Sequence, residues 1–112
     1  MTLENITEVY QHSLTHAKAE ITDTTKTLLV TGVAGQRVKV WEIILSSSVA
    51  QLVYLYTGTE VMVPIHLGAT AGPVFLKSAD KNPLFATNAG ASLFIEAQTS
   101  GNIYVYGHYT VE

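Results

Sequence analysis

The stretch that decides the fold is "TGVAGQRVKVWEIILSSS", residues 31–48, which opens on a glycine-rich turn and ends in three serines. Within it the apolar residues change parity. Val38 and Val40 are even-numbered, whereas from Trp41 onward the apolar residues are odd-numbered, apart from Ile44. Side chains of a strand alternate between two faces, so such a change moves the apolar residues to the other face. A one-residue β-bulge near Trp41 would explain it, as would a strand whose second half is covered on both faces.

From about Thr24 onward the chain consists of short β-rich segments separated by turn residues. The segments recur about every 10 residues, which predicts an all-β sandwich or barrel. Helical periodicity is absent from this region. The expected turns, rich in Gly, Asn, Asp or Ser, fall at residues 31–35, 57–60, 68–72, 79–83, 87–90 and 99–102.

The N-terminal region is ambiguous between helix and strand. Residues 1–13 carry apolar side chains at near-helical spacing, whereas residues 14–22 are compatible with a strand. We therefore expect an arm or short helix over residues 1–13 and a single β-domain over residues 14–112, a size sufficient for one core.

Two segments alternate as half-buried strands do. In residues 60–67 the odd positions, from Val61 to Leu67, are expected to face the core, and Pro64 predicts an edge strand or a bulge because proline cannot donate to a ladder. In residues 102–111 the odd positions, from Ile103 to Val111, are expected to face the core.

The segment "QLVYLYT", residues 51–57, has no clearly polar side. Val53 and Leu55 share one face, and Leu52, Tyr54 and Tyr56 share the other. Either both faces are covered within the fold or one of them is a subunit interface.

Composition narrows the classes of partner. Only 13% of the 112 residues are charged, the net charge is −3, and the six basic residues are scattered along the chain, so binding of nucleic acid is not expected. The chain has no cysteine, no apolar run long enough for a membrane span and no secretory signal. We expect a soluble protein, synthesised in the cytoplasm, that does not associate with a membrane.

Four potential metal ligands recur at four-residue intervals near the N-terminus: Glu8, His12, His16 and Glu20. On a helix they would line one face, as in some metal sites. The segment lacks the glutamate of a His-Glu-x-x-His motif, and on a strand residues four apart lie about 13 Å from each other. A solvated polar face is therefore favoured over a metal site.

Other residues of catalytic type stand alone or outside their motifs. No Gly-x-Ser-x-Gly elbow, phosphate-binding glycine loop, cupin-like histidine cluster or paired carboxylates can be assigned. We predict no catalytic residues, no cofactor and no metal. The residues weighed for these roles are His66, His108, Ser46–Ser48, residues 32–35, Asp80 and Glu96.

Five aromatic residues could form a stacking platform for a sugar: Trp41, Tyr54, Tyr56, Tyr104 and Tyr106. Aromatic side chains also dominate cores and protein interfaces. Because the strands are rich in apolar residues on both sides, a core and a subunit interface are favoured over carbohydrate binding.

Residues 31–112 contain three motifs: a basic strand after a glycine turn, an Asn-Pro segment leading into a strand, and a closing Gly-x-Tyr-x-Val strand. Together these motifs resemble small structural proteins encoded by tailed phages and prophages. This sequence has "NPLF" where a longer stretch is common, and its N-terminal region differs. The matching positions are Gly35, Arg37, Val38 and Val40, then Asn82, Pro83, Phe85, Thr87, Gly90 and Leu93, then Gly107, Tyr109 and Val111.

The resemblance implies a jelly-roll sandwich of about eight strands in two antiparallel sheets. It also implies a virion protein, often a homotrimeric decoration or cement protein on the outer capsid surface, with the major capsid protein as partner. A fibre or tail component is the alternative within this group, and a carbohydrate-binding module is the alternative outside it. The residues expected to contact partners are Leu3, Ile6, Val9 and Tyr10 of the arm, with Tyr54 and Tyr56.

Overall fold

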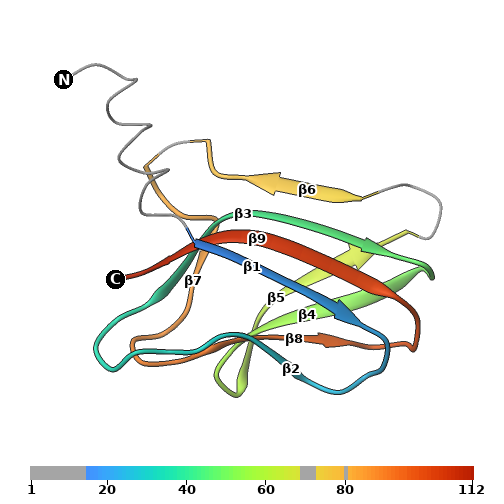
Figure 1. Ribbon diagram of the computed structural model, residues 1–112, viewed down its shortest axis with the longest axis horizontal. Coiled ribbons are helices and arrows are strands. Elements are labelled where there is room, and N and C mark those ends of the chain that lie inside the picture. The colour runs from blue at the N-terminus through green and yellow to red at the C-terminus, as the bar shows by residue number, and fades with distance from the viewer. Residues whose placement is uncertain (1–14, 69–72, 80) are drawn as a thin grey trace.

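The computed structural model describes residues 15–68, 73–79 and 81–112, which form nine β-strands in two packed antiparallel sheets and contain no helix (Figure 1). The expected all-β sandwich is confirmed at this level. The expected arm, with Leu3, Ile6, Val9 and Tyr10, lies outside the described residues. The strands are β1 (Thr15–Ile21), β2 (Thr27–Val30), β3 (Val38–Ser47), β4 (Gln51–Thr57), β5 (Glu60–Leu67), β6 (Val74–Lys77), β7 (Phe85–Ala86), β8 (Leu93–Ala97) and β9 (Ile103–Val111).

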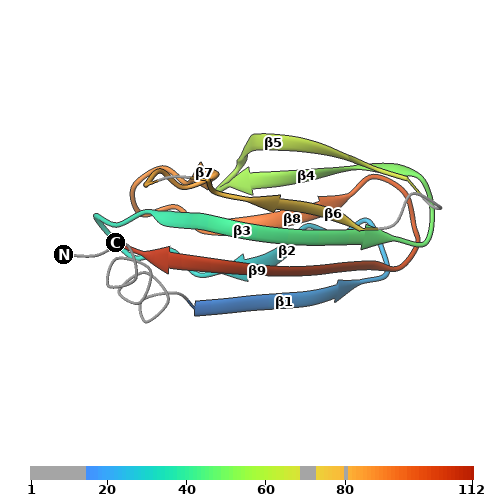
Figure 2. The ribbon, with the colours of Figure 1, turned by 90° about the horizontal axis from the view of Figure 1, so that it is seen from above.

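The first and last strands of the described chain are neighbours in one sheet. The five-stranded sheet has the order β1-β9-β3-β6, with β7 also paired to β3, and the four-stranded sheet has the order β2-β8-β4-β5. Figure 2 shows β9 between β1 and β3, and β4 between β5 and β8. The last strand of the chain is therefore central in one sheet.

A β-bulge lies at Trp41, as the parity change predicts. Val40 pairs with Tyr109 and Glu42 pairs with His108, so Trp41 is the extra residue on β3. On both sides of the bulge the core-facing side chains are fully buried: Val40 is 2% exposed and Ile43 is 2% exposed. The bulge lets both halves of β3 face the same core.

Hydrogen bonds hold the bulge on both sides. The indole Nε1 of Trp41 donates to Thr110 Oγ1 at 3.0 Å, which ties the bulge to β9. The carbonyl of Trp41 accepts from the Ser78 amide at 2.8 Å, and the carbonyl of Val40 accepts from the Leu84 amide at 2.8 Å. The connection between β6 and β7 is thus held against β3 at the bulge.

The core lies between the two sheets and draws on both. Alternate residues of β3, β4, β8 and β9 point inward, so each of these strands contributes its buried side chains in a period of two apart from the bulge. The buried apolar residues are Ile21, Val30, Val38, Val40, Ile43, Leu45, Val53, Leu55, Ile65, Leu67, Leu93, Ile95, Ala97, Ile103 and Val105.

β5 is an edge strand with a bulge of its own, which confirms the interpretation of Pro64. Leu55 pairs with Val63 and Tyr56 pairs with Val61, so Met62 is the extra residue. The expectation that Val61 faces the core is wrong, because this bulge turns Val61 to the outer face, where it is 50% exposed. Met62 packs against the core.

Three of the expected turns contain a glycine in the left-handed region, at Gly35, Gly58 and Gly90. A different constraint applies to Gly32. Its amide donates to Ser92 Oγ at 2.7 Å, and a β-carbon there would clash with the carbonyl oxygen of Gly90 and lie 2.6 Å from the carbonyl carbon of Ala91. The 31–35 turn can meet the 88–92 turn only because residue 32 has no side chain.

We expect Gly32→Ala to lower the free energy of unfolding by about 1–3 kcal/mol, because the two turns must separate to admit the methyl group. Urea unfolding followed by tryptophan fluorescence measures this. Val33→Ala is the control on the same turn, since Val33 is 46% exposed and should change stability by less than about 0.5 kcal/mol. Equal midpoints for Gly32→Ala and the wild type would contradict the close approach of the turns.

Candidate functional site

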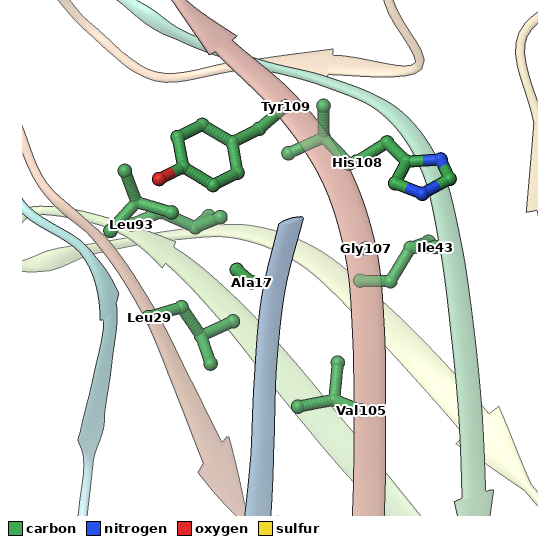
Figure 3. A pocket seen from close by; sticks show the side chains of 10 residues that line it. Ala17, Leu29, Ile43, Leu93, Val105, Gly107, His108 and Tyr109 are labelled. Atoms are coloured by element: carbon green, nitrogen blue, oxygen red, sulfur yellow. The ribbon is translucent and has the colours of Figure 1, made fainter. Parts of the chain in front are cut away.

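A small cavity lies between the sheets where β1 and β9 face β2 and β8 (Figure 3). Its volume of about 10 Å³ is at the lower limit for holding one water. Ala17 and Gly107 line it from one sheet and Leu29 and Leu93 from the other, and the ring of His108 points away from it. The cavity is therefore a packing gap beside two small residues rather than a ligand site.

The residues weighed for catalysis and metal binding do not converge. Among the described residues, no three or more His, Asp or Glu side chains are grouped so that they could hold a metal ion. His16 and Glu20 lie on the strand β1 instead of a helix, so this half of the four-residue series is spread along the strand. Glu8, His12 and Asp80 lie outside the described residues.

Further residues considered for catalysis or phosphate binding lie in turns, at a strand end or on an exposed edge strand. Ser46 and Ser47 end β3, and Ser47 Oγ donates to the Val49 carbonyl at 2.6 Å. The glycine-rich residues 32–35 form the turn between β2 and β3, so they have no helix behind them to bind a phosphate. His66 is exposed on the edge strand β5.

The outer face of the four-stranded sheet carries an apolar row that crosses all four strands. We call this surface the tyrosine face. Leu28 on β2 pairs with Phe94 on β8, Phe94 pairs with Tyr56 on β4, and Tyr56 pairs with Val61 on β5. A second row runs beside it. It consists of Glu96, Tyr54 and Pro64, and Leu52 and His66 form a further pair.

At the centre of the tyrosine face, the charged groups of Lys26 and Glu96 already have partners within the chain. Lys26 Nζ lies 4.4 Å from the ring centroid of Tyr56 and 4.6 Å from that of Phe94, and it donates to the Gly58 carbonyl at 2.7 Å. The hydroxyl of Tyr56 donates to Glu96 Oε1 at 3.0 Å. Covering this face would therefore leave both charges with partners.

The ends of the apolar row are open. Leu28 is 49% exposed and Val61 is 50% exposed, whereas Tyr54 and Tyr56 are half-buried by their neighbours in the sheet. The described chain forms two layers, so no third layer lies over this face (Figure 1). Within the described residues, one face of residues 51–57 therefore packs in the core and the other carries half-buried side chains with no further layer over them.

The five aromatic residues weighed as a sugar platform lie on two different sheets. Tyr54 and Tyr56 belong to the four-stranded sheet, whereas Trp41, Tyr104 and Tyr106 belong to the five-stranded sheet. A platform of all five is therefore wrong. The rings of Tyr54 and Tyr56 are 6.4 Å apart at 84°, so this pair does not present one flat stacking surface.

Sequence reasoning found Tyr54 and Tyr56 but missed the residues around them. Phe94 could have been found, because "LFIEA" alternates and puts Phe94 and Glu96 on the polar parity. The alternation of residues 60–67 places Val61 on the core side, because Pro64 indicates a possible bulge without giving its position. Lys26 reaches the two rings from outside any strand.

No protein-family model, curated protein or solved structure matches the chain closely enough to show a relationship. The resemblance to phage structural proteins therefore stays a prediction. The part of the chain that the structure describes contains no helix with the length and hydropathy needed to cross a membrane.

The surroundings of Tyr56 raise the pKa of its hydroxyl. Partial burial raises the pKa of its hydroxyl above the ordinary tyrosine value, and the hydrogen bond to Glu96 and the charges of Glu96 and Tyr54 raise it further. Because the pKa is raised in the folded state, the stability contributed by this proton is present below the ordinary tyrosine pKa. It is lost as the pH rises through the raised value.

Tyr56→Phe should lower the free energy of unfolding by about 0.5–1 kcal/mol at pH 7, because Glu96 loses a donor in a partly solvated site. The deficit relative to the wild type should be smaller at pH 11, because the unfolded chain loses its tyrosine proton above the ordinary tyrosine pKa of about 10, whereas the folded wild type keeps it at a cost in free energy. Urea unfolding at both pH values measures the two deficits, with Tyr104→Phe on the opposite sheet as the control for the loss of an exposed hydroxyl. An equal deficit at both pH values would show that the Tyr56 proton does not stabilise the face.

Proposed function

We propose that the chain is a structural protein of a tailed-phage virion, a decoration or cement protein that forms a homotrimer and binds the outer capsid surface. Its partners are other copies of itself and the major capsid protein. It acts without catalysis or cofactor, by burying surface between neighbouring subunits. A standard-size interface repeated over a lattice stabilises the whole shell.

The pairing of the strands supports a jelly roll. β4 pairs with β5, β3 with β6, β2 with β8 and β1 with β9, all antiparallel. With the two-residue β7 set aside as an addition to β3, these four pairs are nested like the arms of one long hairpin. A long hairpin rolled into two sheets is the topology of a jelly roll, which is an eight-stranded architecture common in capsid proteins.

The observation that carries the proposal is the apolar row of the tyrosine face. Large contiguous apolar surface on the outside of a domain marks an interaction site, and aromatic residues are enriched at the centre of interfaces. The row ends in exposed Leu28 and Val61, and its two nearby charges, Lys26 and Glu96, already have partners. A partner can therefore cover this face without burying an unpaired charge. We assign the subunit contacts of the trimer to this face.

Light scattering coupled to size-exclusion chromatography tests the assembly. We expect a mass of about 36 kDa for the wild type, which is three times the chain mass of 12.1 kDa. Val61→Lys should give the monomer, because it places a charge at the exposed end of the row. Phe75→Lys is the matched control, since Phe75 is 56% exposed on the other sheet and should stay trimeric. A wild-type monomer would contradict the assembly.

Mounting on the capsid is tested with particles of the encoding phage that lack the chain. Purified wild-type protein should restore density on the outer capsid surface in cryo-EM, and Val61→Lys should restore much less. Density confined to the tail would replace the decoration role with that of a fibre or tail component. Selective glycan binding that is abolished by Tyr54→Ala, with no capsid density, would replace it with a carbohydrate-binding role.

A further inference from the structure

Two histidines that are far apart in the chain meet on the outer face of the five-stranded sheet. His16 on β1 is the direct cross-strand partner of His108 on β9. Their ring centroids are 4.5 Å apart and their planes are tilted by 39°. Directly opposite side chains on one face start from β-carbons about 5 Å apart, a spacing from which two imidazole nitrogens can bind one ion.

Each of the two rings has a second partner at Nδ1. The Tyr106 hydroxyl lies 2.9 Å from His16 Nδ1, and Glu42 Oε2 lies 3.4 Å from His108 Nδ1. A neutral imidazole that donates its Nδ1–H to an oxygen has its lone pair on Nε2. Ligating histidines usually have such an oxygen behind them, because it fixes the tautomer and the ring orientation. In the tautomer whose Nδ1–H faces the Tyr106 hydroxyl or the Glu42 carboxylate, each ring therefore has its Nε2 lone pair available for a metal.

The position of Glu42 is itself a consequence of the β3 bulge. The extra residue Trp41 brings Glu42 into register with His108, on the outer face. Its carboxylate is largely covered, with a side-chain exposure of 19% against 23% for His108. The contact between these two groups is therefore built into the sheet and is not a chance meeting of long exposed side chains.

The acidic and basic side chains on the sheet face around His16 and His108 are equal in number. Glu42 and Glu20 are acidic, and Lys18 and Lys77 are basic. Lys77 on β6 is the cross-strand partner of Glu42, on the side of β3 away from the histidines. The titratable groups facing the pair are Lys18 and Glu20 from β1, Tyr104 and Tyr106 from β9, Glu42 from β3 and Lys77 from β6.

We propose that His16 and His108 form a binding site for a divalent first-row transition metal such as Zn²⁺ or Ni²⁺. Nε2 of each ring is a ligand, and water fills the remaining positions. Glu42 and Tyr106 act as positioning residues behind the two ligands. With two protein ligands the site is exchangeable, unlike the closed four-ligand sites that hold structural zinc. The metal site and the tyrosine face lie on opposite sheets. Metal binding and assembly can therefore be tested independently.

Isothermal titration calorimetry of the full chain with ZnCl₂ and, separately, NiCl₂ at pH 7.5 tests the site. We expect one ion per chain. His16→Gln and His108→Gln should each weaken binding at least tenfold, and Glu42→Gln should weaken it about tenfold. His66→Gln is the matched control, because His66 is also exposed on a strand but lies on the other sheet. Urea unfolding of each variant shows that a lost ion does not reflect a lost fold.

Two further readouts distinguish the pair from a generic histidine effect. Imidazole NMR signals of His16 and His108 should shift together during the titration while that of His66 does not. Binding should weaken at pH 5.5, because protons compete with the metal for the ring nitrogens. Binding that survives His108→Gln but is lost in His16→Gln would overturn the proposal, as would binding lost in His66→Gln or no measurable binding at all.

Discussion

The bulge at Trp41 is the constraint on which the rest of the sandwich depends. β9 keeps one parity toward the core along its whole length, from Ile103 to Tyr109, and β3 lies beside it over nine paired positions. The apolar residues of β3 do not keep one parity, since Val40 and Ile43 must both face inward. One extra residue is the smallest change that reconciles these two strands. Without it, the second half of β3 would turn its apolar residues to the outside.

The same residue organises the edge of the sheet and its outer surface. Before Trp41 the outer neighbour of β3 is β7, and after it the neighbour is β6. The carbonyls of Val40 and Trp41 hold the connection between these two strands. On the outer face the bulge sets Glu42 beside His108. The one-residue bulge in β3 thus determines which side chains face the core, which strands lie at the sheet edge and where Glu42 contacts His108.

Much of this could be predicted from the sequence, because the signals are local. Alternation identified the strand ending at Leu67 and the closing strand, glycines marked the turns, and the parity change located the first bulge. The failures are places where a residue's position depends on a distant strand. Val61 turned outward because of a bulge that only the pairing with β4 defines. The meeting of His16 with His108 requires the register between the first and last strands. Nothing near either histidine in the sequence carries that register.

The edge strands of both sheets have features that disfavour the addition of a further strand. The outer faces of the sheets are therefore the surfaces available for contact. β5 carries Pro64 and a bulge, and β2 has a register shift at Leu29, so neither presents a regular ladder to an added strand. β6 has only four residues, and β1 carries Lys18 on its exposed parity. Such features oppose strand addition in natural sheets. An apolar row with two open ends then remains on one outer face, and a histidine pair remains on the other, together with the cross-strand row of Phe75, Ile44 and Tyr106. The two faces therefore differ in the groups that they present: Lys26 and Glu96 frame the aromatic row on one, and an imidazole pair backed by Glu42 and Tyr106 lies on the other.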